Sequence, residues 1–211
     1  MKKVSLILFF CEIVGTISAQ EKSNFFLMFL HGGYGILPDK TSGLTNSSAS
    51  YIDELSSGVS WNAQAYFRHK ALITGLFYSG YTAKGSLENS SDKILTSYVA
   101  PQLGAAIPVA NRKFDIVINA GVGGIWYQNN SMVFGKERKV RGSSVGVNIG
   151  LKGVYNFSRQ WGVSLEMATI RANLYKTNVN YHYKTIDVKY SGESPFHLDQ
   201  FTFSIGLKYS L

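Results

Sequence analysis

Four histidines and one serine–aspartate pair are the residues of this 211-residue chain whose types could support nucleophilic chemistry. A hydrolytic triad needs a nucleophile, a histidine base and an acid that orients the histidine. Ser91 and Asp92 adjoin in a polar segment, and His182 or His197 could approach them from a later one. Serine and aspartate are also ordinary loop residues, and their spacing fixes no geometry. We therefore interpret this set as solvated loop residues and keep a hydrolytic site as the less favoured alternative.

The histidines do not form a recognisable metal-binding motif. The histidines are His31, His69, His182 and His197, and no two of them have the short spacing of metal ligands. Cys11 is the only cysteine, and it lies in the N-terminal segment. We therefore expect no metal, no disulfide and no cofactor.

Positive charge is a more specific feature of the chain. Lysine and arginine number 21 against 13 acidic residues, which gives a formal net charge of +8. Ammonium and guanidinium groups bind phosphates and acidic sugars through charge-assisted hydrogen bonds. Seven candidate anion-binding residues gather in two polar segments: Lys136, Arg138, Lys139, Arg141, Lys176, Lys184 and Lys189. The alternative is a solvated surface whose charges bind nothing specific.

The elements that must position these residues are β-strands, because large apolar residues recur at every second position. The pattern is plainest in residues 201–211, where they alternate with small or polar residues. Equivalent alternation predicts eight strands, at residues 24–37, 59–68, 71–82, 94–109, 114–126, 144–152, 161–168 and 201–211. A tight turn at residues 69–70 should place Phe67 opposite Leu72 and Trp61 opposite Tyr78.

The connections between the predicted strands alternate between long and short. The polar segments 38–50, 84–93, 128–141 and 172–197 are expected to be long loops, and the other three connections are short turns. Transmembrane barrels have an even number of antiparallel strands, with short turns at one end and long loops at the other. The sequence therefore predicts an all-β fold: an eight-stranded antiparallel up-and-down transmembrane β-barrel. A soluble exported barrel that binds a ligand is an alternative.

Aromatic residues gather near both ends of the predicted strands. Trp61, Tyr78 and Trp126 fall near the long-loop ends, and Phe67, Phe114, Trp161 and Tyr209 fall near the short-turn ends. A bilayer has two interfaces, and each of them favours amphipathic rings. A soluble protein with one core has no reason to sort aromatic residues into two belts, so this pattern favours the membrane barrel.

Five ionisable residues fall on the polar faces of the strands and are therefore expected inside the barrel: Arg68, Asp115, Lys152, Glu166 and Lys208. An eight-stranded barrel is just wide enough for its own side chains to fill. The short turn at residues 157–160 should bring Lys152 near Glu166. We predict an internal network of ion pairs and hydrogen bonds, and the alternative is a proton or ion path.

Residues 175–190 keep a strand-like alternation within the last long connection. This pattern predicts a hairpin that protrudes beyond the membrane and extends the barrel wall. Alternatively, its exposed edge could add a strand to a partner protein.

The first 19 residues have the layout of a cleavable secretory signal peptide. Lys2 and Lys3 precede a short apolar run, and Ser18 and Ala19 form a small-residue cleavage site. Residues 20–211 would then form one exported domain. Because exported proteins rarely meet nucleic acid, we expect no nucleic-acid partner for the basic residues.

The closing segment FTFSIGLKYSL, together with the eight alternating strands, resembles the small outer-membrane β-barrel family of Gram-negative bacteria. The patterns LHGGYG, SYVAPQLG, INAGVGGIWY and WGVSLEMA are similar to variants common in Bacteroidota. The resemblance covers the whole mature chain. It implies a monomer in the cell outer membrane that contacts lipid and lipopolysaccharide and is inserted by the outer-membrane insertion machinery.

For the function, we expect a non-enzymatic role in envelope integrity or in surface interaction. Adhesion to a glycan or protein through the basic loops is one form that this role could take. Some barrels of this size modify lipid A, so a lipid-A-modifying enzyme is the alternative from another functional class.

Overall fold

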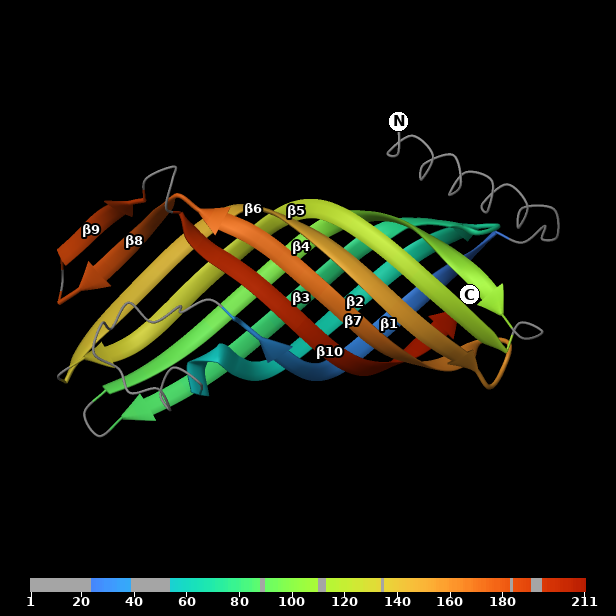
Figure 1. Cartoon of the computed structure of the whole chain (residues 1–211), viewed down its shortest axis with the longest axis horizontal. Coiled ribbons are helices and arrows are strands. Elements are labelled where there is room, and N and C mark those ends of the chain that lie inside the picture. Colours follow the sequence, from blue (N-terminus) through green and yellow to red (C-terminus); the bar gives the residue numbers. More distant parts are fainter. Residues whose placement is uncertain are drawn as a thin grey trace, which may run out of the picture.

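Eight strands close into one antiparallel ring in the computed structural model, which describes residues 24–38, 54–87, 90–109, 113–133, 135–182, 184–190 and 195–211 (Figure 1). The ring strands are β1 (Asn24–Ile36), β2 (Ser57–His69), β3 (Leu72–Leu87), β4 (Ser90–Val109), β5 (Phe114–Val133), β6 (Lys136–Asn156), β7 (Trp161–Leu174) and β10 (Phe196–Ser210). Strand β10 pairs with β1 and closes the ring. The predicted eight-stranded antiparallel up-and-down β-barrel is thereby confirmed. The proposed signal peptide, residues 1–19, lies outside the described residues.

Two further strands form a hairpin beside the ring. Strands β8 (Lys176–Tyr181) and β9 (Lys184–Lys189) pair with each other, and β8 also pairs with the beginning of β6. In Figure 1 the hairpin lies at the end of the barrel opposite to the C-terminus. The predicted hairpin is confirmed, and it extends the barrel wall. Below, this end is called the outer end. Among the described residues, no helix is long and apolar enough to cross a membrane.

Side chains alternate strictly between the two faces of the wall, as the period-two sequence pattern requires. Every second residue of β7 is buried and most of those between are exposed. The outward positions carry large apolar side chains, and Leu30, Val145, Leu165 and Ile205 are all more than 60% exposed. The inward positions of β1 are the odd-numbered ones, which include Leu27, Phe29 and His31. The wall is therefore apolar outside, and its inner face carries both polar and apolar side chains.

Two predicted loops are instead the ends of long strands. Residues 84–87 belong to β3 and 90–93 to β4, while 128–133 continue β5 and 136–141 begin β6. The sequence prediction was wrong here for a physical reason. Beyond the apolar band both faces of a strand are polar, so the period-two signal disappears although the backbone ladder continues.

The predicted pairing of β2 with β3 is also wrong, by two residues. Trp61 lies opposite Gly80, and Tyr78 lies opposite Ala63. The turn is at residues 70–71, where Lys70 adopts a φ of 56°. A Cβ atom on Gly80 would lie 2.3 Å from the Trp61 ring, so the absence of a side chain lets the indole lie over this position.

Candidate functional site

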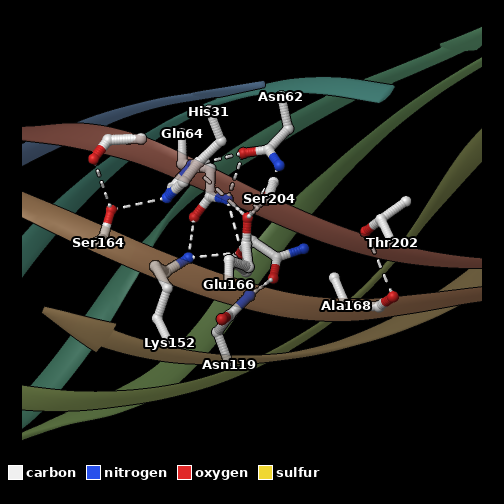
Figure 2. Close-up of polar contacts among 12 residues, drawn as sticks. His31, Asn62, Gln64, Asn119, Lys152, Ser164, Glu166, Ala168, Thr202 and Ser204 are labelled. Carbon is white, nitrogen blue, oxygen red and sulfur yellow. Dashed lines mark hydrogen bonds and ion pairs between the residues drawn. The ribbon is translucent and has the colours of Figure 1, made fainter. Parts of the chain in front are cut away.

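A buried ion pair joins two neighbouring strands inside the barrel (Figure 2). Lys152 on β6 and Glu166 on β7 are direct cross-strand partners. The Nζ atom of Lys152 lies 2.7 Å from Oε1 of Glu166, and both side chains are 0% exposed. The short β6–β7 turn sets this register, since it brings the inward positions of the two strands to the same level.

Two amides of β2 complete the coordination of this carboxylate. Gln64 donates to Oε1 of Glu166 at 2.8 Å, and Asn62 donates to Oε2 at 2.8 Å. Lys152 donates a second hydrogen bond to the carbonyl of Gln64, which also accepts one from the hydroxyl of Tyr66 at 2.8 Å. A buried charge is costly unless such partners replace water. The carboxylate and the ammonium thus hold each other and the amides in one arrangement.

His31 on β1 belongs to the same network, directly across from Asn62 on the neighbouring strand β2 (Figure 2). Its Nδ1 donates to Oδ1 of Asn62 at 2.9 Å, and its Nε2 lies 2.8 Å from the hydroxyl of Ser164. The sequence indicated that His31 faces inward but did not identify it as part of this network. The amides Asn62 and Gln64 lie two residues apart on the polar face of β2, and this spacing is the signal that could have placed them there.

A second polar group lies near the short-turn end of the interior. Arg68 is 3.5 Å from Asp115, and Asn156 donates to the other oxygen of Asp115 at 2.8 Å. Lys208 donates to the amide oxygen of Asn156 at 2.8 Å. The structure therefore divides the five predicted interior residues into two groups, Lys152 with Glu166 and Arg68 with Asp115 and Lys208.

Apolar layers separate these polar groups. One buried cluster, which includes Phe29, Ile73, Val117 and Val154, lies between the two ion-paired groups. A larger cluster fills the interior toward the outer end, and it includes Phe77, Tyr81, Tyr98 and Ile125. Lys152 and Glu166 neutralise each other and are closed off from solvent, whereas the single carboxylate of Asp115 lies with two cations, Arg68 and Lys208, beside a cavity at the short-turn end. Among the described residues, no group of three or more His, Cys, Asp or Glu side chains could hold a metal ion.

The candidate anion-binding residues lie on strands at the outer end, and the prediction of a loop for residues 128–141 was wrong. On β6 they alternate between faces. Arg138 is half-buried on the inner face, 3.8 Å from Asp92, whereas Lys139 and Arg141 are exposed on the outer face. Lys136 is exposed at the tip of the β5–β6 hairpin.

The remaining three cations lie on the β8–β9 hairpin. Lys176 lies 2.8 Å from Asp187, and Lys184 and Lys189 are exposed. The hydrogen bond from Lys176 holds the pKa of the Asp187 carboxyl below its usual value. Because the sequence pattern predicts a loop at residues 84–93, it also missed Lys84 and Lys93, which pair directly across β3 and β4.

The residues considered for hydrolysis are held by separate contacts. Ser91 is exposed, whereas the adjacent Asp92 is buried on the inner face and pairs with Arg138. His197 is exposed and its Nδ1 lies 2.8 Å from Asn173. Consecutive residues of a strand point to opposite faces, so the strand directs Ser91 away from the carboxylate beside it.

The seven belt residues face outward or lie at the surface. Trp61, Tyr78, Trp126, Phe67, Phe114 and Trp161 are each between 37% and 52% exposed, and Tyr209 is partly exposed with its ring centroid 4.8 Å from that of Trp161. Trp161, Tyr209 and Phe114 lie at strand ends beside the short turns, while Trp126 lies toward the outer end of β5.

Solved structures of three membrane proteins have a similar fold. Neisserial surface protein A is 10% identical with a TM-score of 0.51, covering 89% of this chain and 99% of that protein. A major outer membrane protein of Thermus thermophilus is 9% identical with a TM-score of 0.59, covering 90% of this chain and 100% of that protein.

Ail, the attachment invasion locus protein of Yersinia pestis, is 9% identical with a TM-score of 0.54, covering 90% of this chain and 100% of Ail. Ail is also solved in complex with the heparin analogue sucrose octasulfate. No protein-family model matches the sequence, and a comparison with curated proteins finds no relative. At these identities the likeness concerns the fold alone, and the chain has the fold of the small outer-membrane β-barrels.

Proposed function

We propose that this protein is a monomeric, non-enzymatic barrel of the bacterial outer membrane, of the Bacteroidota type, whose outer end binds anionic glycans. Its apolar outer wall would face lipid, and the insertion machinery of the outer membrane would assemble it there. The filled interior supports a structural or surface-interaction role over transport, because two apolar layers interrupt its polar groups.

The distribution of cations at the outer end carries the glycan proposal. Lys136, Lys139, Lys184 and Lys189 are exposed there. Lys84 and Lys93 lie directly opposite each other across β3 and β4, an arrangement that like charges disfavour unless an anion lies nearby. Sulfates and carboxylates of a polysaccharide would supply that anion. The complex of Ail with a heparin analogue supports the same chemistry in a protein of this fold.

Two observations support a non-enzymatic role. Lys152 and Glu166 are inaccessible to a substrate and neutralise each other. Ser91 is directed away from the carboxylate of Asp92, which Arg138 engages. Catalysis requires a nucleophile and its base within hydrogen-bond reach of one substrate. These observations support surface binding over lipid-A modification.

The glycan proposal is tested with heparin and the full-length protein purified in detergent. Replacing Lys136, Lys139 and Lys184 with glutamine should weaken heparin binding about tenfold, which corresponds to roughly 1.4 kcal/mol. The matched control replaces Lys70, Lys113 and Arg159, three exposed cations near the short-turn end, and should leave binding unchanged. Equal losses in the two variants would contradict a site at the outer end.

The membrane placement has a separate test. The protein should sediment with the outer-membrane fraction, and its gel mobility in detergent should change on boiling because a folded barrel is more compact than its unfolded chain. Recovery in the soluble periplasmic fraction would contradict the proposal and favour a soluble ligand-binding barrel.

A further inference from the structure

A groove of about 620 Å³ lies on the outer surface of the wall, toward the outer end. It crosses β4, β5, β6 and β8, and its lining includes Leu95, Trp126, Gln128, Arg141 and Lys176. Apolar rings and methyl groups, amides and two cations thus meet in one hollow. This mixture matches an amphiphile better than a wholly polar or a wholly apolar ligand.

The pairing register orders the outward residues of this region into three rows. The row nearest the apolar wall is Ser97, Trp126 and Ser143, and the next is Leu95, Gln128, Arg141 and Asn178. The third row, farthest out, is Lys93, Asn130, Lys139 and Asn180. Polarity and positive charge therefore increase from the membrane-facing wall outward, as they do along a lipid from its acyl chains to its charged headgroup.

A β-bulge directs Lys176 into this groove. Strand β6 pairs with β7 at Gly146 and Ala172, and with β8 at Gly142 and Thr177. Three residues of β6, 143–145, thus face four residues of the partner, 173–176. The extra residue leaves Tyr175 and Lys176 both exposed between two buried neighbours. Without it, Lys176 would point into the barrel, and bulges commonly redirect a side chain in this way.

The two groove cations have complementary surroundings. Lys176 is held at 2.8 Å by Asp187, which also accepts a hydrogen bond from Asn178. Arg141 is exposed, and in the part of the chain that the structure describes no ion pair engages its guanidinium. A guanidinium binds a phosphate with two parallel hydrogen bonds. Arg141 is therefore ready to take a phosphate, with Lys176 fixed beside it.

We propose that this groove binds the phosphorylated sugar headgroup of an outer-leaflet glycolipid, of the chemical class of lipid A. Arg141 and Lys176 bind its phosphate, while Gln128, Ser143 and Asn178 bind sugar hydroxyls. The acyl chains run past Trp126 and Leu95 along the apolar wall toward Val145. The inference rests on the proposed membrane placement. It does not depend on the glycan binding proposed for Lys136, Lys139 and Lys184.

The test measures binding of bisphosphorylated lipid A to the full-length protein in detergent micelles by native mass spectrometry. Replacing Arg141 and Lys176 with glutamine should weaken binding at least about tenfold, because both phosphate contacts are lost. The matched control replaces Lys136 and Lys184, which removes the same charge from the hairpin tips, and should bind like the wild type. Mobility that changes on boiling checks that each variant is folded.

Two further probes identify the source of the phosphate. Lipid A without phosphates should bind the wild type weakly. Its affinity should match that of phosphorylated lipid A for the variant that lacks Arg141 and Lys176. The deacylated bisphosphorylated disaccharide should also bind weakly, because it lacks the chains that contact the apolar wall. Equal affinity for this soluble headgroup would overturn the assignment to a lipid.

Four other outcomes decide the inference. Unchanged lipid A binding in the Arg141 and Lys176 variant would overturn it, and so would an equal loss in the control. If the Arg141 and Lys176 variant loses lipid A binding while Lys136, Lys139 and Lys184 do not contribute to heparin binding, the inference stands and the glycan proposal fails. If replacing Lys136, Lys139 and Lys184 weakens heparin binding but lipid A binds the Arg141 and Lys176 variant and its control alike, the glycan proposal stands and the inference fails.

Discussion

The ammonium of Lys152 lies 2.7 Å from a carboxylate oxygen of Glu166, and neither side chain has any exposed surface. The two residues face each other across β6 and β7, so the ion pair is also a cross-strand contact. Phe29 and Tyr66 place their rings within 6 Å of the ammonium, at 5.0 and 5.6 Å. The pair therefore has apolar neighbours toward the short-turn end, and each charge depends on the other.

Removing one member of this pair should destabilise the barrel strongly. Replacing Glu166 with glutamine leaves a buried ammonium without its counter-charge, which costs about 3–5 kcal/mol. Replacing Lys152 with methionine as well should lose less than the sum of the two single changes, since neither charge then remains. Urea unfolding of the full-length protein in lipid vesicles measures all three variants. Additive losses would show that the two charges are not energetically coupled.

Asp115 should tolerate the loss of its charge better than Glu166. Its side chain is 10% exposed, and its contact with Arg68 is 3.5 Å long. It lines a cavity at the short-turn end together with Arg68 and Lys208. Water in this cavity can therefore solvate Arg68 and Lys208 when an asparagine replaces Asp115. The Asp115→Asn variant should lose roughly 1–2 kcal/mol, measured by the same urea unfolding, and a loss as large as that of Glu166→Gln would contradict this reasoning.

Two outward-facing glycines should respond oppositely to the same substitution. A Cβ atom at Gly80 would meet the Trp61 ring at 2.3 Å, whereas a Cβ atom at Gly153 would meet nothing within 4 Å. Gly80→Ala should displace the indole and cost about 1–3 kcal/mol. Gly153→Ala should stabilise by roughly 0.4–1 kcal/mol, because it restricts the unfolded chain without a clash. Equal effects on unfolding would mean that Trp61 does not pack on Gly80.

The β8–β9 hairpin should loosen in acid. Lys176 and Asn178 both donate to Asp187, and the pKa of its carboxyl is below the ordinary value. A carboxyl whose pKa is lower in the folded state stabilises the fold above its unfolded pKa. That contribution disappears as the pH falls through the lowered folded pKa.

Hydrogen exchange of the hairpin amides measures this effect. Protection in residues 184–189 should fall in strong acid in the wild type. The Asp187→Asn variant should have low protection at every pH and no acid step. A wild-type acid step that persists in this variant would assign the effect to another group.

The sequence predicted the barrel because the part of its wall with an apolar outer face has only one pattern. In residues 161–168 of β7 and 201–209 of β10 the outward residues are large and apolar while the inward ones are small or polar, so the alternation is unmistakable. In β6 the same strand continues through residues 136–141, where both faces are polar. A search for apolar residues at every second position misses such a segment, because polar residues such as Arg138 also line its inner face.

The candidate sites were only partly predictable for a related reason. The pairing of Lys152 with Glu166 followed from a four-residue turn that fixes the register locally. The participation of His31 did not, because it lies on β1 and meets Ser164 of β7 only when β10 pairs with β1 and closes the ring. The orientation of Lys176 was likewise hidden, since a bulge of one residue leaves no compositional mark in the sequence.

The alternation of polar and apolar layers inside the barrel also affects the pairing register that the strands adopt during assembly. A slip of two residues between β6 and β7 would preserve the inside–outside pattern of every side chain. It would nevertheless place Lys152 opposite Ser164 or Ala168 instead of Glu166. The outer wall cannot distinguish these alternatives, because leucine, valine and isoleucine are interchangeable against lipid. The buried charges therefore penalise a slip of β6 against β7 and reinforce the register that the short turn between them sets.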